Sequence, residues 1–303
     1  MPDHRPPVRQ WRIHLGAHKT ATTHIQEVLA RKRDELIVNG LDFIPHSVVR
    51  KLGLAHALRK RSLRARMPVL RDGIASEILC RTVDPLRKGP DTVVLSEENL
   101  IGALPTMYVD RLYPTADTCI TRLRGLRRRS DVVFFLSIRS FDAQIPASYA
   151  QGLRHKPPLK GGFEAIRRRM LASPPSWLDL VRRICRLAPD VPLVVWRHED
   201  YRTHAEEILA MLCGRPIGPL PQVEDPPETR TPSAEGVRAA EGLSDDLPAH
   251  ERRSIVGEIY RETFEGRRFS PFTREETREL RAHYEANLAG IAALDGVTLL
   301  RFN

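Results

Sequence analysis

The chain has 303 residues, of which 41% are hydrophobic and 28% charged, values typical of a globular protein and unlike those of a disordered one. No apolar run reaches the roughly 18–20 residues needed to cross a bilayer, and the polar N-terminus lacks the apolar core of a secretory signal, so we expect no membrane span and no signal peptide. The net charge of +10 favours anionic partners, namely nucleotides, sulfated or phosphorylated substrates, nucleic acids or membrane surfaces, without choosing among them.

The four cysteines lie far apart and form no CxxC pair. This spacing excludes a zinc ribbon and a disulfide scaffold, predicts no metal site, and suits a reducing, cytoplasmic compartment. We predict a flexible tail over residues 1–10 and a single domain over 11–303. A Pro-rich stretch at 215–233 has no periodicity and predicts a long surface loop inside that domain.

The first predicted elements are a strand at 12–15, which ends at Gly16, and a helix from Thr22 or Thr23. Thr23 and Gln26 have the spacing of a capping box, in which the two side chains bond the first amides of a helix. Asn39 and Gly40 predict the end of that helical region, because both residues tolerate a left-handed cap.

Residues 41–44, just before Pro45, predict a second short strand. Continuously apolar runs bounded by turn signals predict further strands at 92–95, 132–138, 193–196 and 297–302, and helical patterns occupy stretches such as 203–212 and 273–294. Strands that are apolar throughout are typical of a parallel sheet covered on both faces. The alternation of strands and helices therefore predicts an α/β fold with a central, mostly parallel sheet flanked by helices.

The loop between the first strand and the first helix has the sequence GAHKTATT, residues 16–23. A helix N-terminus offers unpaired amides and a positive dipole end, so it binds phosphate, and Lys19 adds a charge. The spacing differs from a Walker A loop, which places Gly-Lys-Ser/Thr at the helix start. The alternative is an ordinary capped helix beside a solvated lysine.

The segment IHLGAHKTATTHIQEVL resembles the 5′-phosphosulfate-binding loop of the sulfotransferase family. This resemblance implies a P-loop-like α/β fold and the donor 3′-phosphoadenosine-5′-phosphosulfate, with no metal. It also implies that Lys19 contacts the bridging region of the donor and that the loop holds the 5′-phosphate through its amides and hydroxyls. The donor-binding residues carried over from the family loop are Gly16, His18, Lys19, Thr20, Ala21, Thr22 and Thr23. The family most often has Gly where Ala21 stands, so we expect either a helical backbone there or a donor that lies slightly farther away.

A second element of the family is a strand that ends in Arg and leads into a helix carrying Ser. In VVFFLSIRSFDAQIPASYA these residues are Arg139 and Ser148, and the resemblance implies that they hold the 3′-phosphate of the donor. They lie nine positions apart, one more than is usual in the family. We expect the helix to begin near Pro146, because proline is best tolerated in a first helical turn.

Three weaker similarities follow in the same order as in the family. DTVVLSEENLIG resembles a strand that ends in a Ser-Glu pair, WRHEDY resembles a strand–helix segment with His198 in place of Tyr, and ETRTPS resembles a late loop that covers the nucleotide through Arg230 and Ser233. With them, the resemblance extends from about residue 12 to 302.

Transfer of a sulfuryl group to a hydroxyl also needs a base. Glu97 and Glu98 follow a buried strand at the edge where α/β sites form, and we favour Glu97 over Glu98. A polar strand end without a catalytic role is an equal alternative for this pair. His18 and His24 flank the loop as less favoured candidates.

We therefore expect a sulfotransferase that acts on a carbohydrate, lipid-linked glycan, peptide tyrosine, small phenol or similar acceptor. A P-loop-like nucleotide kinase or NTPase, or a basic nucleic-acid-binding protein, is the alternative. The basic runs at 59–66 and 122–129 would suit nucleic acid or a polyanion, but a solvated helix face explains them better, and no nucleic-acid partner is expected.

Overall fold

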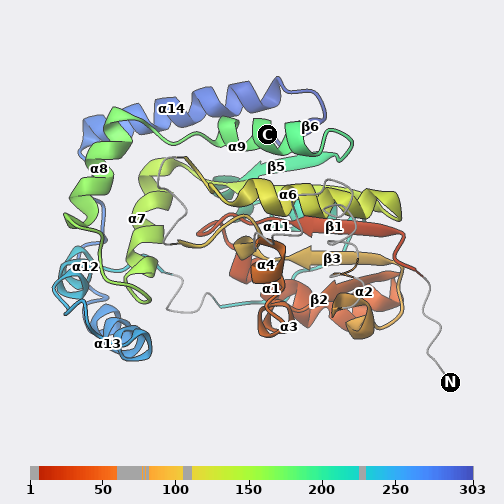
Figure 1. Ribbon diagram of the computed structural model, residues 1–303, viewed down its shortest axis with the longest axis horizontal. Helices are drawn as coiled ribbons and strands as arrows, with labels where there is room; N and C mark the ends of the chain where they lie inside the picture. Colours follow the sequence, from red (N-terminus) through yellow and green to blue (C-terminus); the bar gives the residue numbers. More distant parts are fainter. Residues whose placement is uncertain are drawn as a thin grey trace.

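Six parallel strands form one sheet in the order β2-β3-β1-β4-β5-β6 (Figure 1). The computed structural model describes residues 7–59, 77, 79, 82–104, 111–224 and 230–302. The strands are β1 Gln10–His14, β2 Leu41–Ile44, β3 Thr92–Ser96, β4 Asp131–Ile138, β5 Leu193–Arg197 and β6 Val297–Leu299. All pairings are parallel, which confirms the predicted α/β fold.

Helices cover both faces of the sheet, and successive strand residues point alternately to the two layers. One face carries α1 Thr22–Arg31, α2 Arg33–Val38, α10 His198–Tyr201 and α11 Ala205–Cys213. The other face carries α4 Leu54–Arg59, α6 Ala116–Arg124, α9 Trp177–Leu187 and α14 Arg274–Ala292. In β4, for example, Phe134 packs in the second layer and Phe135 in the first. Burial on both faces explains the continuously apolar strands.

The remaining helices are α3 His46–Lys51, α7 Phe141–Gly152, α8 Gly162–Ala172, α12 Ala234–Glu241 and α13 Ala249–Glu262. Figure 1 shows α7, α8, α12 and α13 beyond the carboxyl ends of the strands. A small apolar cluster joins α12 and α13 to α7 through Ala150, Val237, Val256 and Tyr260. No helix within the described ranges is long and apolar enough to span a membrane.

Three sequence predictions need correction at their boundaries. Val8 is buried and β1 begins at Gln10, so residues 8–10 belong to the fold, while residues 1–6 lie outside the described part. β6 ends at Leu299 and is partly exposed, because it is the edge strand. Helix α7 begins at Phe141, which puts Pro146 inside the helix and not in its first turn.

The strand order puts a topological switch at β1. The chain turns from β1 to β2 and β3 on one side, and it then crosses to β4 and β5 on the other. The loops that follow β1, β3 and β4 therefore meet at one edge of the sheet. Ligands of open α/β sheets bind at such a point, outside the carboxyl ends of the strands.

Candidate functional site

The loop that follows β1 turns sharply at Gly16. Its φ is +78°, and a Cβ added to it would lie 2.5 Å from the Cβ of Glu98. A side chain at this position would therefore clash with the segment after β3. Glycine lets the loops after β1 and β3 lie in direct contact at the switch point.

The carbonyl groups of this loop are turned toward the protein. Four consecutive carbonyls, those of residues 16–19, accept hydrogen bonds from protein donors. The donors are the amide of Ser137, the hydroxyls of Thr20 and Thr22, the side-chain amide of Gln144 and the guanidinium of Arg139. This arrangement fixes the orientation of the peptide units that carry these four carbonyls.

The amides that follow are turned the other way. Within the described part of the chain, the N–H groups of Thr20, Ala21, Thr22 and Thr23 have no acceptor. Lys19 and Ala21 have φ values of 63° and 65°, in the left-handed region. Successive amides in alternating right- and left-handed conformations form a concave nest that binds anions. Of the two alternatives for Ala21, a helical backbone was therefore wrong, and a donor that lies slightly farther away stays a prediction.

The threonine side chains have different roles from those implied by the family loop. Thr20 and Thr22 are buried, and their hydroxyls both donate to the carbonyl of Ala17, at 2.6 and 3.1 Å. Thr23 is exposed on the first turn of α1. The predicted capping box is absent, since Ala21 is the N-cap and the Gln26 amide donates to the carbonyl of Ser96. An anion at this loop would meet backbone amides more than hydroxyls.

A buried chain of polar side chains supports the loop from beneath. His14, at the end of β1, bonds Ser96 of β3 through Nδ1 (2.8 Å) and Ser137 of β4 through Nε2 (3.2 Å). Ser137 in turn lies 2.5 Å from the hydroxyl of Thr20. Burial lowers the pKa of His14 to about 3, so the imidazole is neutral. Donation in one direction from Ser96 through His14, Ser137 and Thr20 to Ala17 satisfies the chain.

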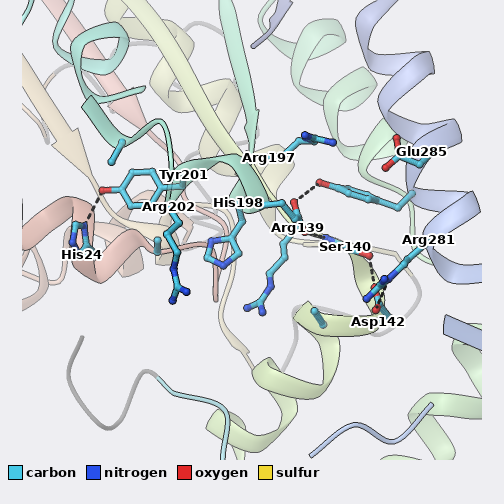
Figure 2. A pocket seen from close by; sticks show the side chains of 15 residues that line it. His24, Arg139, Ser140, Asp142, Arg197, His198, Tyr201, Arg202, Arg281 and Glu285 are labelled. Atoms are coloured by element: carbon cyan, nitrogen blue, oxygen red, sulfur yellow. Dashed lines mark hydrogen bonds and ion pairs between the residues drawn. The ribbon is translucent and has the colours of Figure 1, made fainter. Parts of the chain in front are cut away.

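A pocket of about 690 Å³ opens beside the loop, between the ends of β4 and β5 and helix α14 (Figure 2). Its polar lining includes His24, Arg139, Ser140, Asp142, Arg197, His198, Glu199, Tyr201, Arg202, Arg281, Tyr284 and Glu285. In Figure 2 the side chains of Arg139, His198 and Arg202 point to the same side of the pocket. The pocket is large enough for a nucleotide and has cations on one wall.

Arg139 links the pocket to the loop. Its Nη1 donates to the carbonyl of Lys19 at 3.0 Å, and the guanidinium has no ion pair with any described carboxylate. Burial lowers the pKa of Arg139, partly offset by Glu199 and Asp142. A half-buried guanidinium that bonds only a carbonyl retains donors for phosphate oxygens.

His198 and Tyr201 come from the helix after β5. Burial, followed by the positive charge of Arg139, lowers the pKa of His198 to about 4, so its ring is neutral. The Tyr201 hydroxyl lies 2.9 Å from Nδ1 of His24 on α1. The rings of Tyr201 and His24 close the end of the pocket opposite α14 (Figure 2).

Glu97 and Glu98 differ in how their carboxylate oxygens are hydrogen-bonded. Glu97 is fully buried, and it accepts bonds from Arg50 and from the backbone and side chain of Asn99, so both its oxygens are engaged. Glu98 bonds Arg50 through one oxygen only, and its other oxygen is buried without a partner among the described residues. Burial and the charge of Glu97 raise the pKa of Glu98 to about 7. Of the two carboxylates, Glu98 is therefore the one with an oxygen that accepts no hydrogen bond from the described residues.

The histidines that flank the loop have structural partners. His18 is buried and stacks on Tyr113, whose hydroxyl lies 3.1 Å from Nδ1. Burial lowers the pKa of His18 to about 3, although a hydrogen bond with Asn99 acts in the opposite direction and raises it. The neutral ring of His18 is thus held in the loop by Tyr113, and His24 is hydrogen-bonded to Tyr201.

Three residues carried over from the family lie away from the pocket that Arg139 lines. Ser148 faces a separate small cavity two turns along α7. Ser233 is buried as the N-cap of α12, where its hydroxyl accepts from the amide of Gly236. Arg230 lies over the ring of Phe264, 5.5 Å from its centroid. Residues 225–229 of the same loop lie outside the described part.

The basic run at 122–129 is largely committed to the fold. Arg122 is buried and donates to the carbonyls of Ala57 and Leu58, Arg124 pairs with Asp190, and Arg127 pairs with Asp131. This agrees with the interpretation as a helix face and leaves little of the run for nucleic acid. Of the run at 59–66, only Arg59 lies in the described part of the chain.

Most of the pocket wall was not predicted from the sequence. Tyr201, Arg202 and Arg281 were not among the candidate site residues, and His24 was considered only as a base and not as a residue that lines a pocket. Tyr201 and Arg202 follow β5 at the same edge of the sheet as the loop, and this position could have identified them. Arg281 comes from α14, far along the chain, and no local signal marks it. Comparisons with family models, curated proteins and solved structures found no match for this chain.

Proposed function

We propose that this chain is a sulfotransferase that uses 3′-phosphoadenosine-5′-phosphosulfate as donor. The observation that carries the proposal is the pairing of two anion-binding features at one sheet edge. These are the amide nest of residues 20–23, adjoining Lys19, and the guanidinium of Arg139, which bonds the same loop and faces the 690 Å³ pocket. A nucleotide with two separate phosphate groups matches this arrangement.

Separate parts of the site bind the two phosphates and the nucleoside of the donor. The nest holds the 5′-phosphate, Arg139 holds the 3′-phosphate, and the ring of Tyr201 borders the nucleoside in the pocket. The bound donor supplies the sulfuryl group. Lys19 stabilises the negative charge that develops on the phosphate oxygen when its bond to sulfur breaks, so its contribution grows toward the transition state.

Glu98 removes the proton of the acceptor hydroxyl as that oxygen bonds to sulfur. A base is most effective when its pKa lies near the working pH, and the pKa of Glu98 is raised to about 7. Its unpaired oxygen is the one available for the proton. The rate should therefore rise with pH until Glu98 is ionised.

The first experiment is calorimetry and thermal shift with 3′,5′-ADP, ATP, 5′-AMP and duplex DNA. We expect 3′,5′-ADP to bind most tightly, and Arg139→Ala to weaken it by about 1.5–3 kcal/mol, the range for a lost charge-assisted contact. Arg182→Ala, an exposed arginine of α9, is the matched control and should change nothing. Equal shifts with ATP would favour a kinase or NTPase, and a larger shift with DNA would favour the nucleic-acid alternative.

Lys19→Ala should lower turnover by on the order of 10²–10³, the scale for loss of one preorganised charge donor. Affinity for 3′,5′-ADP should change far less, because Arg139 and the amides remain. Lys19→Arg should restore little, because a forked guanidinium does not replace a compact ammonium. The measurement is donor-dependent sulfation beside calorimetry, and full turnover in Lys19→Ala would contradict the assigned role.

A further inference from the structure

A second, smaller cavity of about 110 Å³ lies along α7, and neither Arg139 nor the loop after β1 lines it. Its wall is mostly apolar, with Leu104, Ile145, Ile166 and the exposed Leu159 among the lining residues, and Tyr149 and Lys156 also line it. Engineered apolar cavities of roughly 150 Å³ bind benzene. The cavity is therefore suited to one aryl ring or a short alkyl chain.

Ser148 gives this cavity one buried polar atom. Ser148 is 6% exposed, and its Oγ is buried without a hydrogen-bond partner in the described part of the chain. A serine inside a helix ordinarily bonds the carbonyl three or four residues earlier, and buried hydroxyls are rarely left unpaired. The Ser148 hydroxyl in the wall of a cavity points to a ligand with one hydrogen-bonding oxygen.

The cavity lies farther along α7 than the nucleotide pocket does. One helical turn before Ser148, Gln144 donates to the carbonyl of His18 at 3.1 Å, so Ser148 lies about 6 Å farther along the helix. The nucleotide pocket instead uses the first turn of α7, at Ser140 to Ala143. Leu104 follows Glu98 in the segment after β3. The cavity thus shares α7 with the nucleotide pocket, and it shares the segment after β3 with Glu98.

We infer that this cavity binds the apolar arm of the acceptor, an aryl or short alkyl group that carries an oxygen within reach of Ser148. This role rests on the proposed function and names its acceptor class as a small apolar alcohol. A saccharide would lose the hydration of several hydroxyls against a wall that is mostly apolar. Ser148 is accordingly assigned to the acceptor and not to the 3′-phosphate of the donor.

Gly152 provides a variant that fills the cavity without disturbing the fold. It lies on the helical backbone of α7 in the cavity wall, and a Cβ added there would meet nothing within 4 Å. Gly152→Leu should block the cavity and leave the unfolding midpoint unchanged or higher, since leucine favours a helix more than glycine does. Ser148→Ala removes only the hydroxyl. Ser254→Ala, at an exposed position of α13, is its matched control.

The test is calorimetric titration of the intact protein with 4-methylphenol, toluene and glucose, and separately with 3′,5′-ADP. We expect saturable binding of 4-methylphenol that is about 3- to 10-fold weaker in Ser148→Ala, lost in Gly152→Leu and unchanged in Ser254→Ala. Toluene should bind more weakly than 4-methylphenol and should not respond to Ser148→Ala. Affinity for 3′,5′-ADP should be the same in all four proteins.

Several outcomes would overturn the inference. These are absence of 4-methylphenol binding, binding that survives Gly152→Leu, tighter binding of glucose, or loss of 3′,5′-ADP affinity in Ser148→Ala, which would return Ser148 to the donor. If 4-methylphenol behaves as expected but the wild-type protein does not bind 3′,5′-ADP, the cavity stands as an apolar binding site and the sulfotransferase proposal fails.

Discussion

Lys19 and Ala21 both adopt left-handed backbone conformations within three residues of the loop after β1. For residues with a side chain such a conformation costs roughly 1–2 kcal/mol each. The surrounding bonds hold them there, because Arg139 fixes the carbonyl of Lys19 and two threonines fix that of Ala17. The loop therefore stores strain at the place where we propose the 5′-phosphate binds, as functional loops often do.

Ala21→Gly should relieve part of this strain and stabilise the protein by about 0.5–1 kcal/mol, since glycine adopts positive φ without a steric cost. The matched control is Ala30→Gly, at a helical position of α1, which should destabilise by about 1 kcal/mol. Urea denaturation of the two variants measures both values. Equal destabilisation by the two substitutions would contradict the left-handed conformation of Ala21.

At the scale of elements, two helices that look alike in sequence begin differently. Thr273 caps α14 with the reciprocal bonds of a capping box to Glu276. Thr23 and Gln26 have the same spacing, yet Thr23 lies inside α1 and Gln26 bonds β3. The start of α1 lacks a side-chain cap, which leaves its amides open to a ligand.

Thr273→Ala should cost about 1 kcal/mol of stability, the usual value for a lost N-cap. Thr23→Ala should change the stability by less than half of that, because no capping bond is lost. Thermal or urea unfolding of both variants tests the comparison. A loss of similar size in Thr23→Ala would mean that the predicted capping box forms in solution.

Most of the strands were predictable because they are apolar runs between turn residues, as 92–95 and 193–196 show. The position of the loop between β1 and α1 and that of Arg139 at the end of β4 were also predictable, since both follow from local sequence. The left-handed conformation of Ala21, the start of α7 at Phe141 and the different bonding of Glu97 and Glu98 were not. Each depends on contacts between distant segments, such as that of Gly16 with Glu98, which no local pattern encodes.

At the scale of the whole molecule, burial holds several titratable groups in their neutral form. It lowers the pKa of His14 and His18 to about 3 and, together with Arg139, that of His198 to about 4. It raises the pKa of Glu98 to about 7, with a contribution from Glu97. These shifts make the stability depend on pH in opposite directions.

The unfolded state takes up protons on the three histidines below pH 6.5 and the native state does not, so they reduce stability as pH falls toward 4. Glu98 acts oppositely, since between about pH 4.5 and 7 only the native state keeps its proton, and stability falls as pH rises.

The free energy of unfolding of Glu98→Gln, relative to that of the wild type, should therefore rise by roughly 1–3 kcal/mol when the pH is raised from 5 to 7. Urea denaturation at the two pH values measures the difference, with the exposed Glu265→Gln as control. If the gap between Glu98→Gln and wild type is the same at both pH values, Glu98 has an ordinary pKa and loses its place as the base.

The central position of β1 has a consequence for synthesis of the chain. β1 pairs with β3 and β4, so Gln10 must meet both Thr92 and Asp131. At a translation rate of about 5–20 residues per second, roughly 6–25 s pass between synthesis of the first strand and of the end of β4. During that interval Trp11 and Ile13, fully buried in the finished protein, lack the neighbour that β4 provides. The apolar side chains of β1 thus stay incompletely covered until residue 138 has been made, which leaves this strand prone to aggregation during synthesis.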